Sequence, residues 1–228
     1  AQWQGHCWYR RTLTLDAAAA GSCTWLRFGA AMNVAEVWLD GQLLGRNLGG
    51  WTPFVFDLSK RLVPGVKSTL AVRLDNRDNA ATGAKPLADL DFNMYGGLYR
   101  MVELVTKDQL HITDPILADR PGAGGVLVRT TAASRERATL EVKVHVMNTA
   151  PGPRAFAIRV RLEDAAGRVG AHTATNPSPL LATQDQHAFL NWTVERPALW
   201  HPHAPHLHTL HTELVANGRV IDSERTRI

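Results

Sequence analysis

Apolar and polar residues alternate over short stretches of the first half of the chain, and turn-forming residues separate these stretches. The alternating stretches are residues 8–15, 24–28, 35–39, 69–74 and 97–105. Because successive side chains of a strand point to opposite faces of a sheet, this pattern predicts β-strands with one buried face. Asp40-Gly41 lies between two apolar runs, and this dipeptide accommodates the positive φ angles of a type I′ turn. We therefore expect a tight hairpin at residues 40–41.

A second series of strand patterns follows Asp114-Pro115. Its members are residues 125–131, 138–147, 155–162, 186–194, 206–215 and 219–227. Their lengths and turn spacing are typical of an immunoglobulin-like sandwich. No amphipathic helix of 10 to 15 residues separates the strands, which argues against a parallel sheet with crossover helices. With 228 residues to divide, we predict two all-β sandwich domains, at residues 1–115 and 116–228.

The charge pattern indicates neither nucleic acid nor membrane as a partner. The 25 Lys and Arg residues are interleaved with 21 Asp and Glu residues, so the net charge of +4 forms no basic stripe. No run of about 18 apolar residues is present, as a membrane span needs. Residues 1–4 lack the pattern of a signal peptide. The compartment stays open between cytoplasm, periplasm and the exterior.

The two cysteines are expected to remain thiols. Residues 8–15 and 24–28 read as a hairpin that turns near residues 16–21, which places Cys23 opposite Leu13 or Thr14. Cys7 then lies about 20 Å farther along its strand, beyond the reach of a disulfide.

Several phrases of the first half go beyond simple alternation. They are residues 8–11, 28–41, 49–54, 70–76 and 91–100, the last reading Asp-Phe-Asn-Met-Tyr-Gly-Gly-Leu-Tyr-Arg. In order and spacing they resemble the N-terminal sugar-binding jelly roll of family 2 glycoside hydrolases. Residues 197–208 resemble a Leu-Trp-x-Pro segment of the immunoglobulin-like domain that follows in that family, with His208 in place of a tyrosine. The resemblance implies a jelly-roll, galactose-binding-like β-sandwich followed by an immunoglobulin-like β-sandwich.

The resemblance also implies a function for the larger protein. Members are retaining glycosidases, whose two catalytic carboxyl groups lie about 5 Å apart. In the family both belong to a (β/α)₈ barrel after these domains, and no position here matches them, so we name no catalytic residue. The expected partners are this barrel and a terminal β-galactoside. β-Galactosidases are favoured because of residues 91–100, and β-glucuronidases and β-mannosidases share both domains.

Asp91 is the residue expected to contact sugar, since the matching aspartate of the family accepts hydrogen bonds from substrate hydroxyls. Its alternative role is to cap the turn before a strand at Gly97. Asn93 is the second candidate substrate contact. Asn93 and Tyr95 share the loop and would also adjoin a Mg²⁺ or Na⁺ in the intact enzyme, whereas these domains themselves are expected to hold no cofactor. For Tyr95, packing is the preferred interpretation.

Aromatic and histidine residues offer two further constellations. Trp38, between Val37 and Leu39, is expected to anchor the sandwich core rather than to stack on a sugar. The glycine pairs 49–50 and 96–97 are assigned to turn geometry and close backbone approach. Histidines at 201, 203, 206, 208 and 211 could suggest zinc, but prolines at 202 and 205 interrupt them and no cysteine is near. No metal site is predicted.

Two other functions remain as alternatives to a part of a larger enzyme. The chain could be a stand-alone carbohydrate-binding module, which predicts measurable sugar affinity. It could instead be an interaction protein that forms a homo-oligomer through its second domain. A sandwich scaffold by itself does not decide between them.

Overall fold

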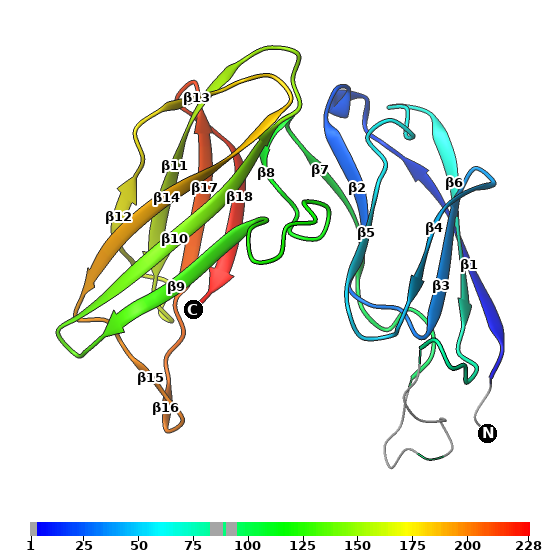
Figure 1. The fold of residues 1–228 in the computed structure, drawn as a ribbon, viewed down its shortest axis with the longest axis horizontal. Coiled ribbons are helices and arrows are strands. Elements are labelled where there is room, and N and C mark those ends of the chain that lie inside the picture. The colour runs from blue at the N-terminus through cyan, green and yellow to red at the C-terminus, as the bar shows by residue number, and fades with distance from the viewer. Residues whose placement is uncertain (1–3, 83–88, 90–94) are drawn as a thin grey trace. The chain divides into compact units, whose positions relative to one another are not determined.

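The structure is a computed structural model that describes residues 4–82, 89 and 95–228. The described chain is almost entirely β-structure, with one 3₁₀ turn, η1 (Ala17–Ala19), as its helical element (Figure 1). It divides into two compact units, Ala1–Thr106 and Lys107–Ile228. No described helix is long and apolar enough to cross a membrane.

The first unit is a sandwich of two antiparallel sheets. One sheet has the order β1 (His6–Thr14), β6 (Lys67–Asp75), β3 (Val34–Leu39), β4 (Gln42–Leu48). The other has the order β5 (Phe54–Asp57), β2 (Cys23–Phe28), β7 (Val102–Lys107). In Figure 1 the strands of the first sheet lie side by side in blue to cyan.

The core of the first unit forms because alternate residues of these strands turn inward. Phe28, Val37 and Leu74 are completely buried, and Phe28 stacks on Phe54 with ring centroids 4.6 Å apart. The predicted hairpin at Asp40-Gly41 is confirmed, since it joins β3 to β4 with φ values of 49° and 80°. The predicted jelly-roll sandwich is confirmed by this architecture.

The second unit is also a sandwich. Its first sheet has the order β14 (Gln184–Glu195), β10 (Arg137–Asn148), β8 (Leu110–Ile112), with β9 (Val126–Ala133) also paired to β10. Its second sheet has the order β12 (Val169–Ala174), β11 (Arg154–Glu163), β17 (Thr209–Ala216), β18 (Arg219–Arg227), with β13 (Ser178–Leu180) also on β11. A small hairpin of β15 (Trp200–His201) and β16 (Ala204–Pro205) stands apart.

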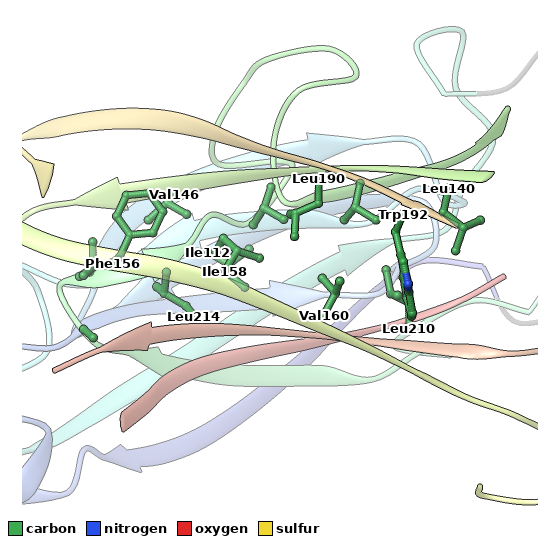
Figure 2. Packing of buried hydrophobic residues seen from close by; sticks show 14 of the residues in the cluster. Ile112, Leu140, Val146, Phe156, Ile158, Val160, Leu190, Trp192, Leu210 and Leu214 are labelled. Atoms are coloured by element: carbon green, nitrogen blue, oxygen red, sulfur yellow. The ribbon is translucent and has the colours of Figure 1, made fainter. Parts of the chain in front are cut away.

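A continuous apolar core lies between these two sheets. Ile112, Ile158, Leu210 and Leu214 are completely buried, and Trp192 packs with them (Figure 2). Several strands had no clear pattern in the sequence, because they are short or exposed: β5, β8, β12 and β13. The immunoglobulin-like sandwich predicted for this half is confirmed.

The predicted hairpin between the first two strands is wrong. β1 pairs with β6, with Leu13 opposite Ser68, whereas β2 pairs with β5 in the other sheet. The chain therefore crosses from one sheet to the other at η1. Cys7 and Cys23 form no disulfide, as expected, but they are separated by the sandwich topology rather than along a hairpin.

Along the chain, the boundary between the two units falls between Thr106 and Lys107 rather than at the predicted 115/116. The difference arises from β8, whose residues Leu110 and Ile112 are completely buried in the second core. Ile112 also donates its backbone N–H to Asp222 Oδ2 at 2.8 Å. The Asp114-Pro115 dipeptide therefore lies after the first strand of the second domain, not before the domain.

Candidate functional site

One end of the first sandwich gathers several loops around the segment Met32–Asn33. Met32 and Gly97 exchange backbone hydrogen bonds, with N···O distances of 3.0 and 3.2 Å. The Asn33 N–H donates to Asp75 O at 3.1 Å, and Gly49 N–H donates to Asn33 O at 3.1 Å. These bonds hold together the chain around residues 32–33, 49–50, 75–76 and 96–97. We call this region the loop end.

The first glycine pair serves this arrangement in two ways. Gly49 has φ of +103°, a conformation that L-residues with side chains rarely adopt. At Gly50 an added Cβ would lie 2.3 Å from Met32 Sδ, so the loop could not approach Met32 as closely. The Tyr99 hydroxyl then donates to the Gly50 carbonyl.

The second pair has the same two requirements in the reverse order. At Gly96 an added Cβ would lie 2.7 Å from Asn76 Nδ2. Gly97 has φ of +90°, and its Cβ would lie 2.6 Å from the Tyr9 hydroxyl oxygen. The assignment of both glycine pairs to turn geometry and close approach is therefore confirmed.

Charged groups border the loop end at the last residues of β6. His6 Nε2 lies 2.9 Å from Asp75 Oδ2, and Arg77 donates to both Asp75 oxygens at 2.9 and 2.6 Å. The hydrogen bonds from Arg77 hold the pKa of Asp75 well below its usual range, against the opposing effect of partial burial. This carboxylate is thus ionised and fully engaged, which makes it a positioning group for His6 and Arg77 rather than an acid.

Asn33 is the most buried polar side chain of the loop end. It is 6% exposed, and its Nδ2 donates to Thr82 Oγ1 at 2.6 Å. The Asn76 side chain accepts from the Gly5 N–H at 2.7 Å. Both amides therefore tie loops to the sandwich, which makes this end a rigid base for the residues around it.

The predicted sugar contacts Asp91 and Asn93 lie outside the described residues. Their neighbour Tyr95 is described and is 74% exposed. The expectation that Tyr95 packs into the domain is therefore wrong.

The histidines of the second half do not gather into one cluster. His211 lies on β17, where Nε2 is 2.6 Å from Glu163 Oε2 and Nδ1 is 3.2 Å from Arg161. His201 and His203 lie in the β15–β16 hairpin, with ring centroids 5.3 Å apart. Over the described ranges, no three His, Cys, Asp or Glu residues could hold a metal ion together.

Sequence reasoning gave no role to His6 and Arg77. The available signal was the polar run that follows β6, Asp75-Asn76-Arg77-Asp78-Asn79, at the end of an alternating strand. A polar run after a strand marks a loop, but it does not show which distant residue the loop will meet. His6 is 69 positions away from its partner Asp75.

Comparison with known proteins places both units in one family. The profile "Glycosyl hydrolases family 2, sugar binding domain" matches residues 1–108, and the profile "Glycosyl hydrolases family 2" matches residues 125–228. A β-glucuronidase of Formosa agariphila is 28% identical over 226 residues, covering 97% of this chain and 23% of its own length. A β-galactosidase of Bacteroides ovatus is 27% identical over 223 residues, covering 97% and 24%.

The fold agrees with solved structures as well. A β-glucuronidase of Bacteroides uniformis superposes with a TM-score of 0.83 at 27% identity, over 99% of this chain and 26% of that chain. The chain thus spans about a quarter of the length of the relatives it matches. Since the two matches together cover nearly every residue, the chain belongs to glycosyl hydrolase family 2 and carries its sugar-binding domain followed by its immunoglobulin-like domain.

Proposed function

We propose that this chain is the non-catalytic N-terminal region of a retaining β-glycosidase, in which it scaffolds a catalytic barrel and lends a loop to the substrate site. The observation that carries the proposal is the order of the two family domains along one chain, with a rigid loop end on the first. Loops on a rigid sandwich are favoured positions for binding residues. In this proposal the two sandwich domains position the barrel and the loop, and the barrel provides the two carboxyl groups of the reaction.

Asp91 is the proposed substrate contact within this chain, with Asn93 as the second. A carboxylate accepts hydrogen bonds from two vicinal hydroxyl groups at once, and such charge-assisted bonds orient a sugar ring. The described residues beside this segment support the role, because Tyr95 is exposed while Gly97 is fixed to Met32. Gly97, which follows this segment in the chain, is thus firmly held.

The substrate proposed from the sequence is a terminal β-galactoside, on the motif at residues 91–100. A β-glucuronide is the second candidate, because relatives of similar identity carry both names, β-glucuronidase at 28% and β-galactosidase at 27%. The two sugars differ at C6, where a glucuronide bears a carboxylate. A glucuronide site therefore needs a positively charged side chain to pair with this carboxylate, and a galactoside site does not.

The test uses the complete polypeptide to which this chain belongs, assayed with p-nitrophenyl β-galactoside and β-glucuronide. Asp91→Ala should lower kcat/KM for the preferred substrate by roughly 10- to 100-fold, since hydrogen bonds to a charged group are lost. Asp89→Ala is the matched control, because Asp89 is an exposed carboxylate in the same segment. An unchanged kcat/KM for Asp91→Ala would remove this residue as a substrate contact.

A separate experiment on the 228-residue chain alone tests the rival of a stand-alone binding module. Calorimetry of the 228-residue chain with galactose or glucuronate should show no heat of binding at millimolar sugar, because the barrel provides most contacts. Saturable binding that Asp91→Ala abolishes would instead favour a module that acts without a barrel.

A further inference from the structure

Two tryptophans lie in contact on the outer face of the β1-β6-β3-β4 sheet. The ring centroids of Trp8 and Trp38 are 5.3 Å apart, and the rings are tilted by 33°. Trp8 is 61% exposed, and Trp38 is partly exposed. The expectation that Trp38 anchors the core is therefore wrong. Its neighbours Val37 and Leu39 point inward and are buried, so Trp38 points outward.

The strand register explains how the two rings meet. Trp8 pairs with Arg73 on β6, and Trp38 pairs with Ala71 on the other side of β6. The small Ala71 side chain leaves room above the central strand, so that rings from the two flanking strands approach each other across it. The apolar surface of these two rings thus remains exposed to water and is not part of the hydrophobic core.

Arg73 and Glu36 fix the geometry of this surface. The Arg73 guanidinium carbon lies 6.0 Å from the Trp8 ring centroid and 5.9 Å from that of Trp38, within cation–π range. Glu36 forms an ion pair with Arg73 and lies 4.0 Å from Arg46 on β4. The Arg73 guanidinium therefore lies beside both rings and is itself held by Glu36.

The charge around the rings is positive. Arg10 is exposed on β1, opposite Ala71, and makes no ion pair with another residue of the described chain. Arg46 and Arg73 share the single carboxylate of Glu36. We call the six residues the tryptophan platform: Trp8, Trp38, Arg10, Arg46, Arg73 and Glu36.

We propose that the tryptophan platform binds a carbohydrate chain that carries carboxylates, as uronic-acid polysaccharides do. The apolar C–H face of a pyranose ring can lie on the exposed Trp8 ring, since indoles offer large rigid contact area. Arg10 can then pair with a uronate carboxylate, and the planar guanidinium fits a carboxylate in a bidentate manner. Three arginines against one glutamate favour an acidic glycan over a neutral one.

Nucleic acid is the less suitable occupant of this face. Single-stranded nucleic acid requires a continuous basic groove beside its stacking rings. Here Glu36 lies within the platform, and Asp75, two residues after Arg73 on β6, lies on the same face of the sheet. The proposal is independent of the loop end, because it requires no contact from Asp91 and no catalytic barrel.

Titration of the 228-residue chain with polygalacturonate, followed by calorimetry and tryptophan fluorescence, tests the platform. Wild type should bind polygalacturonate. Trp8→Ala should raise the dissociation constant by about tenfold or more, as expected when an aromatic anchor is lost. Arg10→Gln should weaken polygalacturonate binding by about fivefold, since one charge-assisted contact is lost. Trp200→Ala is the matched control, with Trp200 59% exposed in the second unit, and should bind as wild type does.

Two further ligands separate the chemistry of binding. Carboxyl-reduced polygalacturonate should bind at least fivefold more weakly than polygalacturonate. The affinity for dextran sulfate should be the same for Trp8→Ala and wild type, because this polymer offers charge without a uronate ring that could stack on Trp8.

Circular dichroism of each variant shows whether it is folded, and Arg10→Gln provides a second variant, because the change lies at an exposed residue. Equal binding of Trp8→Ala and wild type, or equal binding of the reduced polysaccharide, would overturn the proposal. A wild type that binds no polysaccharide but dimerises through Trp8 would overturn it as well.

Discussion

Gly97 shows how much a single residue contributes to the loop end. It combines a positive φ with a close approach to β1, where the Tyr9 hydroxyl lies 2.6 Å from the place of a Cβ. Its backbone also holds Met32 through two hydrogen bonds. The position therefore excludes side chains for two separable reasons, conformation and contact.

We expect Gly97→Ala to lower the free energy of unfolding of the first unit by about 2 kcal/mol, of which roughly half comes from the φ angle. In a Tyr9→Phe background the contact with the hydroxyl disappears, so the cost of Gly97→Ala should fall to about 1 kcal/mol. Urea unfolding monitored by tryptophan fluorescence measures both values. Gly152→Ala serves as control, since its Cβ would meet no atom within 4 Å. Equal costs in the two backgrounds would show that the hydroxyl contact is irrelevant.

At the level of elements, the loop between β8 and β9 is closed by one side chain of β10. Thr113 N–H donates to His145 O at 3.0 Å, and His145 N–H donates to Gly125 O at 2.9 Å. The buried imidazole contacts Thr113 Oγ1 through Nδ1 at 2.9 Å and Asp185 Oδ2 through Nε2 at 2.6 Å. An ionised carboxylate only accepts hydrogen bonds, so Nε2 carries the proton.

Neighbouring loop residues strengthen this closure. Arg120 lies 3.0 Å from Asp185, and His187 stacks on His145 with ring centroids 4.6 Å apart. The hydrogen bond from His145, followed by the charge of Arg120, lowers the pKa of Asp185 against the effect of burial. The loop is thus fastened to β10 and β14 by charge as well as by its backbone.

Asp185→Asn should lower the free energy of unfolding at pH 7 by about 2 kcal/mol, the value of a hydrogen bond to a charged group. Because the folded pKa is depressed, the stabilisation is present above the unfolded pKa of about 4 and is lost as pH falls below it. In urea unfolding, the difference between wild type and variant should therefore begin to shrink as pH falls below about 4 and should disappear only as pH passes below the depressed folded pKa of Asp185.

Asp119→Asn is the control for this pH series. Asp119 is an exposed residue of the same loop, and its exchange should change the free energy of unfolding by less than about 0.5 kcal/mol at every pH. A pH-independent deficit of Asp185→Asn would show that shape, not charge, fastens the loop.

At the scale of the whole molecule, each unit has its own hydrophobic core. The position of the boundary between the units therefore determines which truncated chains can fold. Leu110 and Ile112 of β8 are completely buried among residues of the second unit. Lys107, just before β8, lies 3.0 Å from Asp222 and forms a second ion pair with Glu224 on β18. The nine residues from 107 to 115 therefore belong to the second unit.

Two truncations test this boundary. A chain of residues 107–228 should fold as an independent domain with a cooperative thermal transition. A chain of residues 116–228 lacks Leu110 and Ile112, and the loss of two buried side chains should cost roughly 4 kcal/mol or more, close to the whole stability of a domain. Circular dichroism melting compares them. Equal melting temperatures would place the boundary near residue 115 instead.

Much of the fold could be predicted because local rules decide it. The alternation from Ala138 to Met147 predicted most of β10, and Asp40-Gly41 predicted the β3–β4 turn from its φ requirements alone. The glycine pairs of the loop end were also interpreted correctly, since a glycine requirement is a property of the local backbone. The family resemblance then identified both sandwiches.

Pairing partners and faces could not be predicted in the same way. β1 pairs with β6 rather than with the next strand, because sheet partners depend on the packing of two layers and not on sequence distance. In Val37-Trp38-Leu39 all three residues are apolar, and the polar residue Glu36, which shares a strand face with Trp38, indicated the outer face only weakly. The packing of the core buried Val37 and Leu39, and Trp38 remained outside.

The sequence by itself determined that this protein is all-β, has two sandwiches and resembles the N-terminal domains of family 2 glycoside hydrolases, because turns, alternation and motifs are local properties. Only the tertiary structure decided that β8 belongs to the second core, that His6 meets Asp75, and that Trp8 and Trp38 form an exposed pair. Those features depend on contacts between distant residues, which form only when both sheets of each sandwich pack.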